Sequence, residues 1–244
     1  MRNKLIPIGK TAHLLDISIN TLRRWDASGR LKSIRSGKSG HRYYSQSEID
    51  EFLQEVNILA RNWVLASVPT EPSPDIYCKT RDVFQGRLEK FQSKLTRIAP
   101  INTVSLVTAV AGEIGNNSFD HNLGNWPDLP GIFFSYSMRN QTVVLADRGL
   151  GILSTLQRVR PQLTNSEEAL KVAFTETISG RYPEARGNGL KFVRSVIIEN
   201  PFSLYFQTGD ASLHLKEKDT DIIIKKTDTF IRGCFVIIGF ESLI

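Results

Sequence analysis

The most constraining stretch of this sequence is residues 110–122, which read V-A-G-E-I-G-N-N-S-F-D-H-N. Apolar residues at helical spacing predict that this stretch forms the C-terminal half of a helix. Glu113 and Asn117 are four residues apart and therefore share one side of that helix, which Asp120 and His121 continue. A carboxylate beside an amide oxygen suits Mg²⁺, which takes hard oxygen ligands and keeps several waters. A solvated polar helix face is the alternative interpretation.

A strand-like segment with an acidic end follows. Residues 143–146 are an apolar run that ends in Asp147, and Gly149 and Gly151 come directly after it. A carboxylate at the end of a strand can accept a hydrogen bond from an adenine amino group. The glycines would let the backbone pass close to the ring. This pattern therefore favours a purine site.

A second glycine pair opens a later helical pattern. Gly187 and Gly189 stand just before an apolar helical repeat that begins at Leu190. Glycines at a helix N-terminus can cradle a phosphate, because unpaired N–H groups and the helix dipole face the anion. Arg181 and Arg186, in the loop before this turn, are candidate phosphate contacts or solvated loop charges. Either glycine pair alone is typical of an ordinary turn, but the three segments in this order indicate ATP binding.

These three segments resemble the GHKL ATPases, the group that includes histidine kinases, gyrase-type ATPases and anti-sigma serine kinases. The resemblance implies a two-layer α/β sandwich of the Bergerat type, with ATP and Mg²⁺ as ligands. It implies that Asn117 holds Mg²⁺, that Glu113 orients or activates the attacking group, and that Asp147 binds adenine. The positions that match the family's boxes are Glu113, Asn117, His121, Asp147, Gly149, Gly151, Gly187, Gly189 and Leu190.

Two departures from the GHKL pattern bear on activity. Asp120 stands where many members carry Lys or Arg, and Lys191 and Phe192 follow Leu190 where the family's box usually has a further glycine. The resemblance therefore supports nucleotide binding more directly than fast turnover. The chain also shows no pair of dimerisation and phosphoacceptor helices, which argues against a conventional sensor histidine kinase. Whether the protein is an enzyme stays open, as an ATPase or a serine/threonine protein kinase.

The basic charge is concentrated at the N-terminus. Residues 1–44 carry ten Lys or Arg against Asp16 and Asp26, a net charge of +8. The whole chain has a net charge of +6, so the remainder carries −2. This asymmetry indicates a polyanion partner for the N-terminal segment.

The basic segment has the pattern of a helix-turn-helix with a wing. A short helix over residues 8–15 is followed by a turn in which Ser18 can cap a second helix over 19–27. Residues 29–44 then predict a basic β-hairpin, and a third helix starts near residue 45. Leu22 and Trp25 are expected inside the unit. The outward candidates for DNA contact are Asn20, Thr21, Arg23 and Arg24 on the second helix and Arg35, Lys38, His41 and Arg42 on the wing.

These residues resemble the MerR-like and excisionase-like winged helix-turn-helix domains. The motifs T-L-R-R-W at 21–25, G-R-L at 29–31 and G-H-R-Y-Y at 40–44 are similar to the N-terminal domain of certain serine recombinases. The resemblance covers about residues 5–55 and implies binding to double-stranded DNA, with Arg23 and Arg24 in the major groove. A protein-interaction module that keeps this fold is the alternative.

The chain is expected to divide at a proline-rich linker, because three prolines fall within residues 69–74. We predict an α+β protein with a winged helix-turn-helix at 1–63, a linker at 64–80 and a Bergerat-type domain at 81–244. No apolar run approaches the roughly 18–20 residues that span a bilayer. Two distant cysteines without metal-type spacing are expected to be reduced. We therefore expect a cytoplasmic protein without a membrane segment.

The combination of these parts predicts a DNA-binding regulator. Its ATP-bound and ATP-free states would differ in dimerisation or in binding to a protein partner, and a homodimer is expected. A serine/threonine kinase that resembles the anti-sigma-factor kinases, with a protein substrate, is the alternative. An ATP-gated interaction protein is a third possibility.

Overall fold

The computed structural model describes residues 4–15, 17–36, 40–177 and 189–241 of the 244-residue chain. Its contacts divide the chain into two compact units. The first comprises residues 1–59 with 137–140, and the second comprises residues 60–136 with 141–244. The basic segment lies in the first unit, and the acidic and glycine motifs lie in the second.

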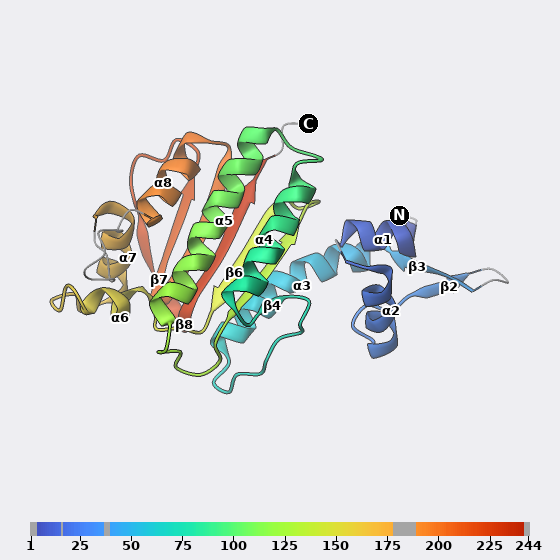
Figure 1. Ribbon diagram of the computed structural model, residues 1–244, viewed down its shortest axis with the longest axis horizontal. Coiled ribbons are helices and arrows are strands. Elements are labelled where there is room, and N and C mark those ends of the chain that lie inside the picture. The colour runs from blue at the N-terminus through green and yellow to red at the C-terminus, as the bar shows by residue number, and fades with distance from the viewer. Residues whose placement is uncertain (1–3, 16, 37–39, 178–188, 242–244) are drawn as a thin grey trace. The chain divides into compact units, whose positions relative to one another are not determined.

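The N-terminal unit packs helices on a small antiparallel sheet. Helices α1 (Ile8–Leu14) and α2 (Ile19–Ser28) are the two helices that the sequence predicted (Figure 1). Strands β2 (Ile34–Ser36) and β3 (His41–Ser45) form the expected hairpin. Strand β1 (Leu5–Pro7), which the sequence analysis missed, pairs with the other side of β3 and completes the order β1-β3-β2.

Helix α2 has defined ends and an apolar inner face. The Ser18 hydroxyl accepts a hydrogen bond from the Thr21 N–H at 2.9 Å, which satisfies a donor that the helix start leaves unpaired. Leu22 and Trp25 are buried on the inner side. The Trp25 ring packs against Phe52 of the next helix, α3 (Gln46–Leu65), with 4.9 Å between ring centroids.

The second unit is built on a five-strand antiparallel sheet. Its strand order is β4-β5-β6-β8-β7. The strands span Tyr77–Cys78 (β4), Ile132–Ser137 (β5), Thr142–Asp147 (β6), Phe202–Lys216 (β7) and Ile224–Phe240 (β8). The edge strand β4 falls within the linker expected at residues 64–80, where Ile76 also accepts a backbone bond from Phe134.

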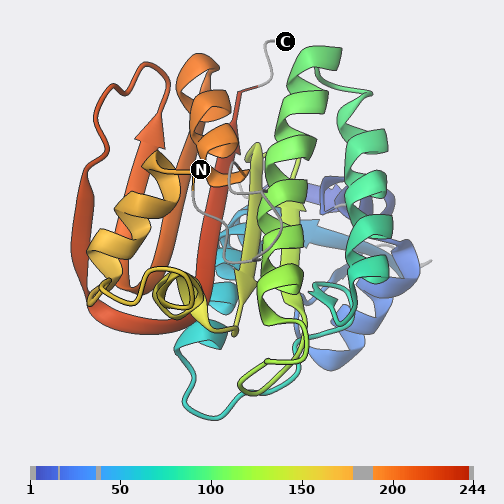
Figure 2. The same ribbon diagram turned by 60° about the vertical axis from the view of Figure 1, so that its left-hand side comes forward.

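Helices cover one face of this sheet, as Figures 1 and 2 show. The long helix α5 (Ile101–Asn122) lies between α4 (Arg81–Leu95) and α8 (Gly189–Glu199). Helices α6 (Gly151–Gln157) and α7 (Ser166–Thr175) lie along β7. Aromatic contacts join the two layers, with Phe84 against Phe134 at 5.3 Å and Phe174 against Phe206 at 5.4 Å.

Strand β7 folds back on itself. The rings of Tyr205 and His214 are 4.7 Å apart, although nine residues of straight strand would span roughly 30 Å. The reversal lies at Gly209, which has φ +55° and stands at the register shift between β7 and β8. The sequence pattern at 203–207 and 212–216 predicts two separate strands, whereas the structure has one bent strand.

The other expected elements have close counterparts. The apolar pattern around Glu113 predicts a helix from about residue 104, and that helix begins at Ile101. The amphipathic pattern at 166–175 predicts a helix, and α7 has the same limits. The apolar repeat that begins at Leu190 predicts a buried face that includes Ile198. In α8 the buried apolar residues are Val193, Val196 and Ile197, whereas Ile198 is half-buried. Within the described ranges, no helix is both long and apolar enough to cross a membrane.

Candidate functional site

The basic face of the N-terminal unit lies on α2 and the wing. Asn20, Arg23 and Arg24 are exposed, as predicted, and Arg23 Nη1 donates to the Asn20 side chain at 3.4 Å. Thr21 is half-buried, and its backbone N–H is taken up by the Ser18 cap. On the wing, Arg35 is exposed. The backbone of α2 thus holds a row of basic and amide side chains toward solvent.

Asp26 connects α2 to the wing. Its carboxylate accepts from the Ser33 N–H at 2.8 Å and from Arg42 Nε at 2.7 Å. Burial opposes ionisation of this group, but the hydrogen bonds from Arg42 and Ser33 outweigh it and lower the pKa of Asp26. Arg42, predicted as a DNA contact, therefore also has a structural partner. His41 is exposed, and Lys38 lies outside the described residues.

The second candidate site begins on α5. Asn117 Nδ2 donates to Glu113 Oε1 at 3.0 Å, so the two side chains predicted to share one helix side are in direct contact. Glu113, Asn117 and His121 are all half-buried, which disfavours a simple solvated face. Asp120, the departure from the GHKL pattern, forms an ion pair with Arg81 at the start of α4.

The N-terminus of α8 lies directly against Glu113. A Cβ atom added to Gly189 would overlap Glu113 Oε1, so the position needs glycine unless the carboxylate moves away. The positive end of the α8 dipole favours the negative carboxylate. Leu190, next to it, is half-buried, whereas Gly187 and Arg186 lie outside the described residues.

Asp147 is the buried acid of the site. It is the last residue of β6 and only 2% exposed. Its Oδ2 accepts from the Ser118 hydroxyl at 2.8 Å, and its Oδ1 accepts from the Gly149 N–H at 2.8 Å. Burial outweighs these bonds and raises the pKa of Asp147 to about 6. Because Ser118 follows Asn117, this contact joins the strand end to the polar side of α5.

The two glycines after Asp147 meet different requirements, one steric and one of backbone conformation. A Cβ on Gly149 would overlap the Asn122 side chain, whose Oδ1 accepts from the Leu150 N–H at 2.8 Å. Gly151 has φ +75°, a conformation that favours glycine. The turn thus fits tightly against the end of α5.

Residues on strands β7 and β8 complete the site. Thr208 Oγ1 donates to the Gly233 carbonyl at 2.9 Å and accepts from the Ile152 N–H at 3.2 Å. Gly233 has φ +74°, and a Cβ there would overlap Asp147. Ser118, Asn122, Thr208 and Gly233 were not predicted from the sequence. Ser118 and Asn122 could have been found from their helical spacing with Ile114, but nothing local in the sequence marks Thr208.

Comparison with known proteins found a family match within the first unit. Residues 7–44 match the family model of the MerR family regulatory protein. Residues 7–44 therefore form a helix-turn-helix of the MerR type, as the sequence predicted. This match covers α1, α2 and the wing, where the exposed basic residues lie.

The chain is also similar to a curated bacterial protein. It is 23% identical to the type II methyltransferase M.Eco47II of Escherichia coli over 219 residues. The alignment covers 81% of this chain and 49% of that protein, so the chain spans about half the length of this relative. Because 81% of the chain is far more than the N-terminal unit, the similarity extends over much of the second unit.

Proposed function

We propose that this protein is a DNA-binding regulator whose second unit binds ATP with Mg²⁺ in a GHKL domain of the Bergerat type. ATP occupancy would control dimerisation or binding to a protein partner. DNA recognition belongs to the MerR-type unit. The nucleotide part of the proposal depends on the arrangement of side chains in the second unit.

The observation that supports nucleotide binding is that three segments distant in the sequence contact one another. Gly189 lies against Glu113, which holds Asn117, and the next residue, Ser118, binds Asp147. The three sequence segments thus form one continuous chain of contacts. A purine acceptor, an oxygen ligand and a glycine helix start are the parts that an ATP site needs.

The described residues fit ATP and Mg²⁺. Asp147 would accept the adenine amino group, and the α8 N-terminus after Gly189 would face the phosphates. Asn117 would supply an oxygen to Mg²⁺, its Nδ2 being held by Glu113. Among described residues, no group of three or more His, Cys, Asp or Glu side chains could hold a metal alone. Mg²⁺ bound with a nucleotide needs only one or two protein oxygens, because phosphates and waters supply its other ligands. The bound metal would neutralise phosphate charge.

Glu113 is the candidate general base. Its carboxylate is half-buried and oriented by Asn117, so it could take a proton from an attacking water or hydroxyl. Hydrolysis and transfer to a serine or threonine of a protein substrate both need such a base. Radiolabel transfer from ATP to a co-expressed partner distinguishes the two.

Calorimetric titration with ATP and Mg²⁺ tests the nucleotide site in the full chain. We expect the wild type to bind, and Asp147→Asn and Asn117→Ala to lose most of the affinity. Asp120→Asn is the matched control, since it alters a neighbouring acid of α5 that pairs with Arg81 and has no proposed ligand role. No binding by the wild type would refute the proposal.

S-adenosylmethionine is the informative competitor in the same titration. The adenine amino group of S-adenosylmethionine would donate to Asp147 in the same way as that of ATP. S-adenosylmethionine has no phosphates for the α8 N-terminus. The similarity to a methyltransferase makes this ligand relevant. Tighter binding of S-adenosylmethionine than of ATP would contradict an ATP site and favour methyl transfer.

Gel mobility of a random-sequence duplex, with and without ATP, tests the coupling between the two units. We expect ATP to change the affinity or the stoichiometry of the complex. Equal binding in both conditions, in a protein that binds ATP, would leave the two sites independent and remove the regulatory part of the proposal.

A further inference from the structure

Arg148 is a buried arginine next to the acid of the candidate nucleotide site. It directly follows Asp147, is 1% exposed and is the largest fully buried side chain described. A guanidinium can be buried only when its donors are well paired, because an unpaired buried charge is very unfavourable. Its partners therefore show why this residue type is needed at the position.

The guanidinium joins two separate segments. Nε and Nη2 donate to the Asp128 carboxylate, the closest distance being 2.8 Å from Nη2 to Oδ2. Nη1 donates to the backbone carbonyl of Trp63. A planar fork of this kind fits a carboxylate on one side and a carbonyl on the other, which Lys cannot reproduce.

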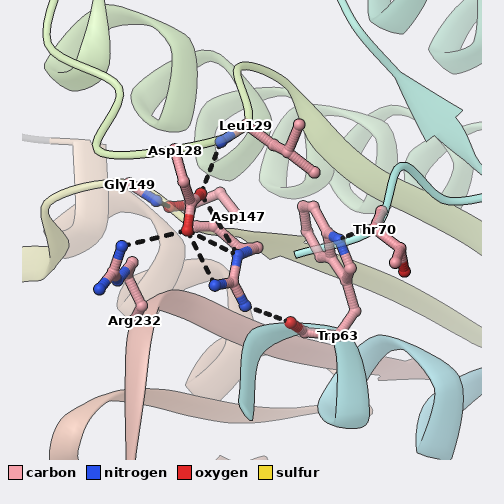
Figure 3. A network of polar contacts seen from close by, with 8 residues as sticks. Trp63, Thr70, Asp128, Leu129, Asp147, Gly149 and Arg232 are labelled. Carbon is pink, nitrogen blue, oxygen red and sulfur yellow. Dashed lines mark hydrogen bonds and ion pairs between the residues drawn. The ribbon is translucent and has the colours of Figure 1, made fainter. Parts of the chain in front are cut away.

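Asp128 lies at the centre of the contacts in Figure 3. It belongs to the loop that follows α5, and its carboxylate also accepts from Arg232 Nη1 at 3.1 Å and from the Leu129 N–H at 2.6 Å. Arg232 precedes Gly233, which lies against Asp147. The network therefore lies next to Asp147.

Trp63 provides the second partner of the Arg148 guanidinium, through its backbone carbonyl. It is among the last four residues of α3, whose carbonyls have no acceptor role inside the helix and need other donors. Its ring packs near Tyr77 and Phe133, and its Nε1 donates to the Thr70 carbonyl at 3.0 Å. Helix α3 starts at Gln46, directly after strand β3 of the DNA-binding unit.

We propose that Arg148 is a positioning residue that links occupancy of the Asp147 site to the end of α3. The inference rests on the proposed ATP site. A ligand seated against Asp147 and Gly149 orders or shifts the turn that carries Arg148. Since its guanidinium is held at both ends, the change reaches the Trp63 carbonyl and alters how firmly the last turns of α3 are held.

Hydrogen–deuterium exchange of the full-length protein tests this link. Exchange of peptides covering residues 60–70 is followed without nucleotide and at saturating ATP·Mg²⁺, with saturation set for each variant by calorimetry. The variants are Arg148→Lys and Arg148→Met. Arg232→Gln is the matched control, because it removes a cation from Asp128 without touching Trp63.

In the wild type we expect ATP to slow exchange at 60–70 by about fivefold or more, the lower end of typical coupling between sites. Both Arg148 variants should lose this ATP-dependent difference, whatever their exchange without nucleotide, and Arg232→Gln should keep it. A purely structural role would change only the exchange measured without nucleotide.

Three results would overturn the link. Wild-type protein that binds ATP without a change at 60–70 refutes the coupling and leaves the ATP site intact. Arg148→Lys and Arg148→Met proteins that keep the ATP-dependent difference refute the role of Arg148. Calorimetry showing no ATP binding refutes the link together with the proposed function, so the two failures are distinguishable.

Discussion

At the scale of single residues, the buried acid Asp147 has a measurable consequence for stability. Its pKa of about 6 is higher than the ordinary value of 3.8 because burial penalises the charged form. Between these two pH values the folded state binds more protons than the unfolded state, so the free energy of unfolding falls as pH rises. The stability is fully present below about pH 3.8 and lost through about pH 6.

We therefore expect Asp147→Asn to be more stable than the wild type at pH 7, by up to about 3 kcal/mol. The difference should shrink toward pH 4, where the wild-type carboxyl is protonated. Denaturant unfolding of both proteins across this range measures it. A difference that is independent of pH would show that Asp147 titrates normally in the folded protein.

At the scale of elements, the start of α2 depends on one side chain. Ser18 caps the helix through its bond to the Thr21 N–H. Ser18→Ala should destabilise the N-terminal unit by about 1 kcal/mol, whereas Ser18→Asp, which can also cap, should cost little. Thermal unfolding followed by circular dichroism measures both. Equal losses in the two variants would show that the cap bond is not the cause.

The start of α8 makes a different prediction. Gly189→Ala should leave stability within about 1 kcal/mol of the wild type, since alanine suits a helix and Glu113 Oε1 is the free end of a flexible side chain. The displaced carboxylate would lose Asn117, and we expect ATP affinity to fall about tenfold, the equivalent of one hydrogen bond.

The control for this change is Gly86→Ala on α4, where a Cβ would meet nothing within 4 Å. Calorimetry should give this variant wild-type affinity for ATP. Wild-type affinity in Gly189→Ala as well would mean that contact between Glu113 and α8 is irrelevant to the ligand.

At the scale of the whole molecule, the uneven charge predicts how DNA binding depends on salt. The first 44 residues carry a net +8 and include Arg35, which is exposed on the wing. Arg35→Ala should weaken binding to a random-sequence duplex and reduce the slope of log affinity against log salt by about 1. Lys225→Ala, an exposed cation of the second unit, should change neither. Equal effects of the two substitutions would place the DNA contact elsewhere.

Sequence alone determined the elements whose signals are local. The cap at Ser18, the helix at 166–175 and the stacking of Glu113 with Asn117 follow from spacing along the chain, and the structure contains all three. The family match at residues 7–44 supports the same conclusion for the helix-turn-helix. Each of these features depends on residues only a few positions apart.

The tertiary structure decided the contacts between distant segments. Strand β1 forms only because β3 pairs with it 38 residues later, and the second residue of the D-R-G-L-G turn, Arg148, had no sequence signal for burial. Its partners Trp63 and Asp128 are 85 and 20 residues away. Pairing energies of this kind depend on which surfaces meet after folding, whereas a pattern along the chain reports only which face of each element is apolar.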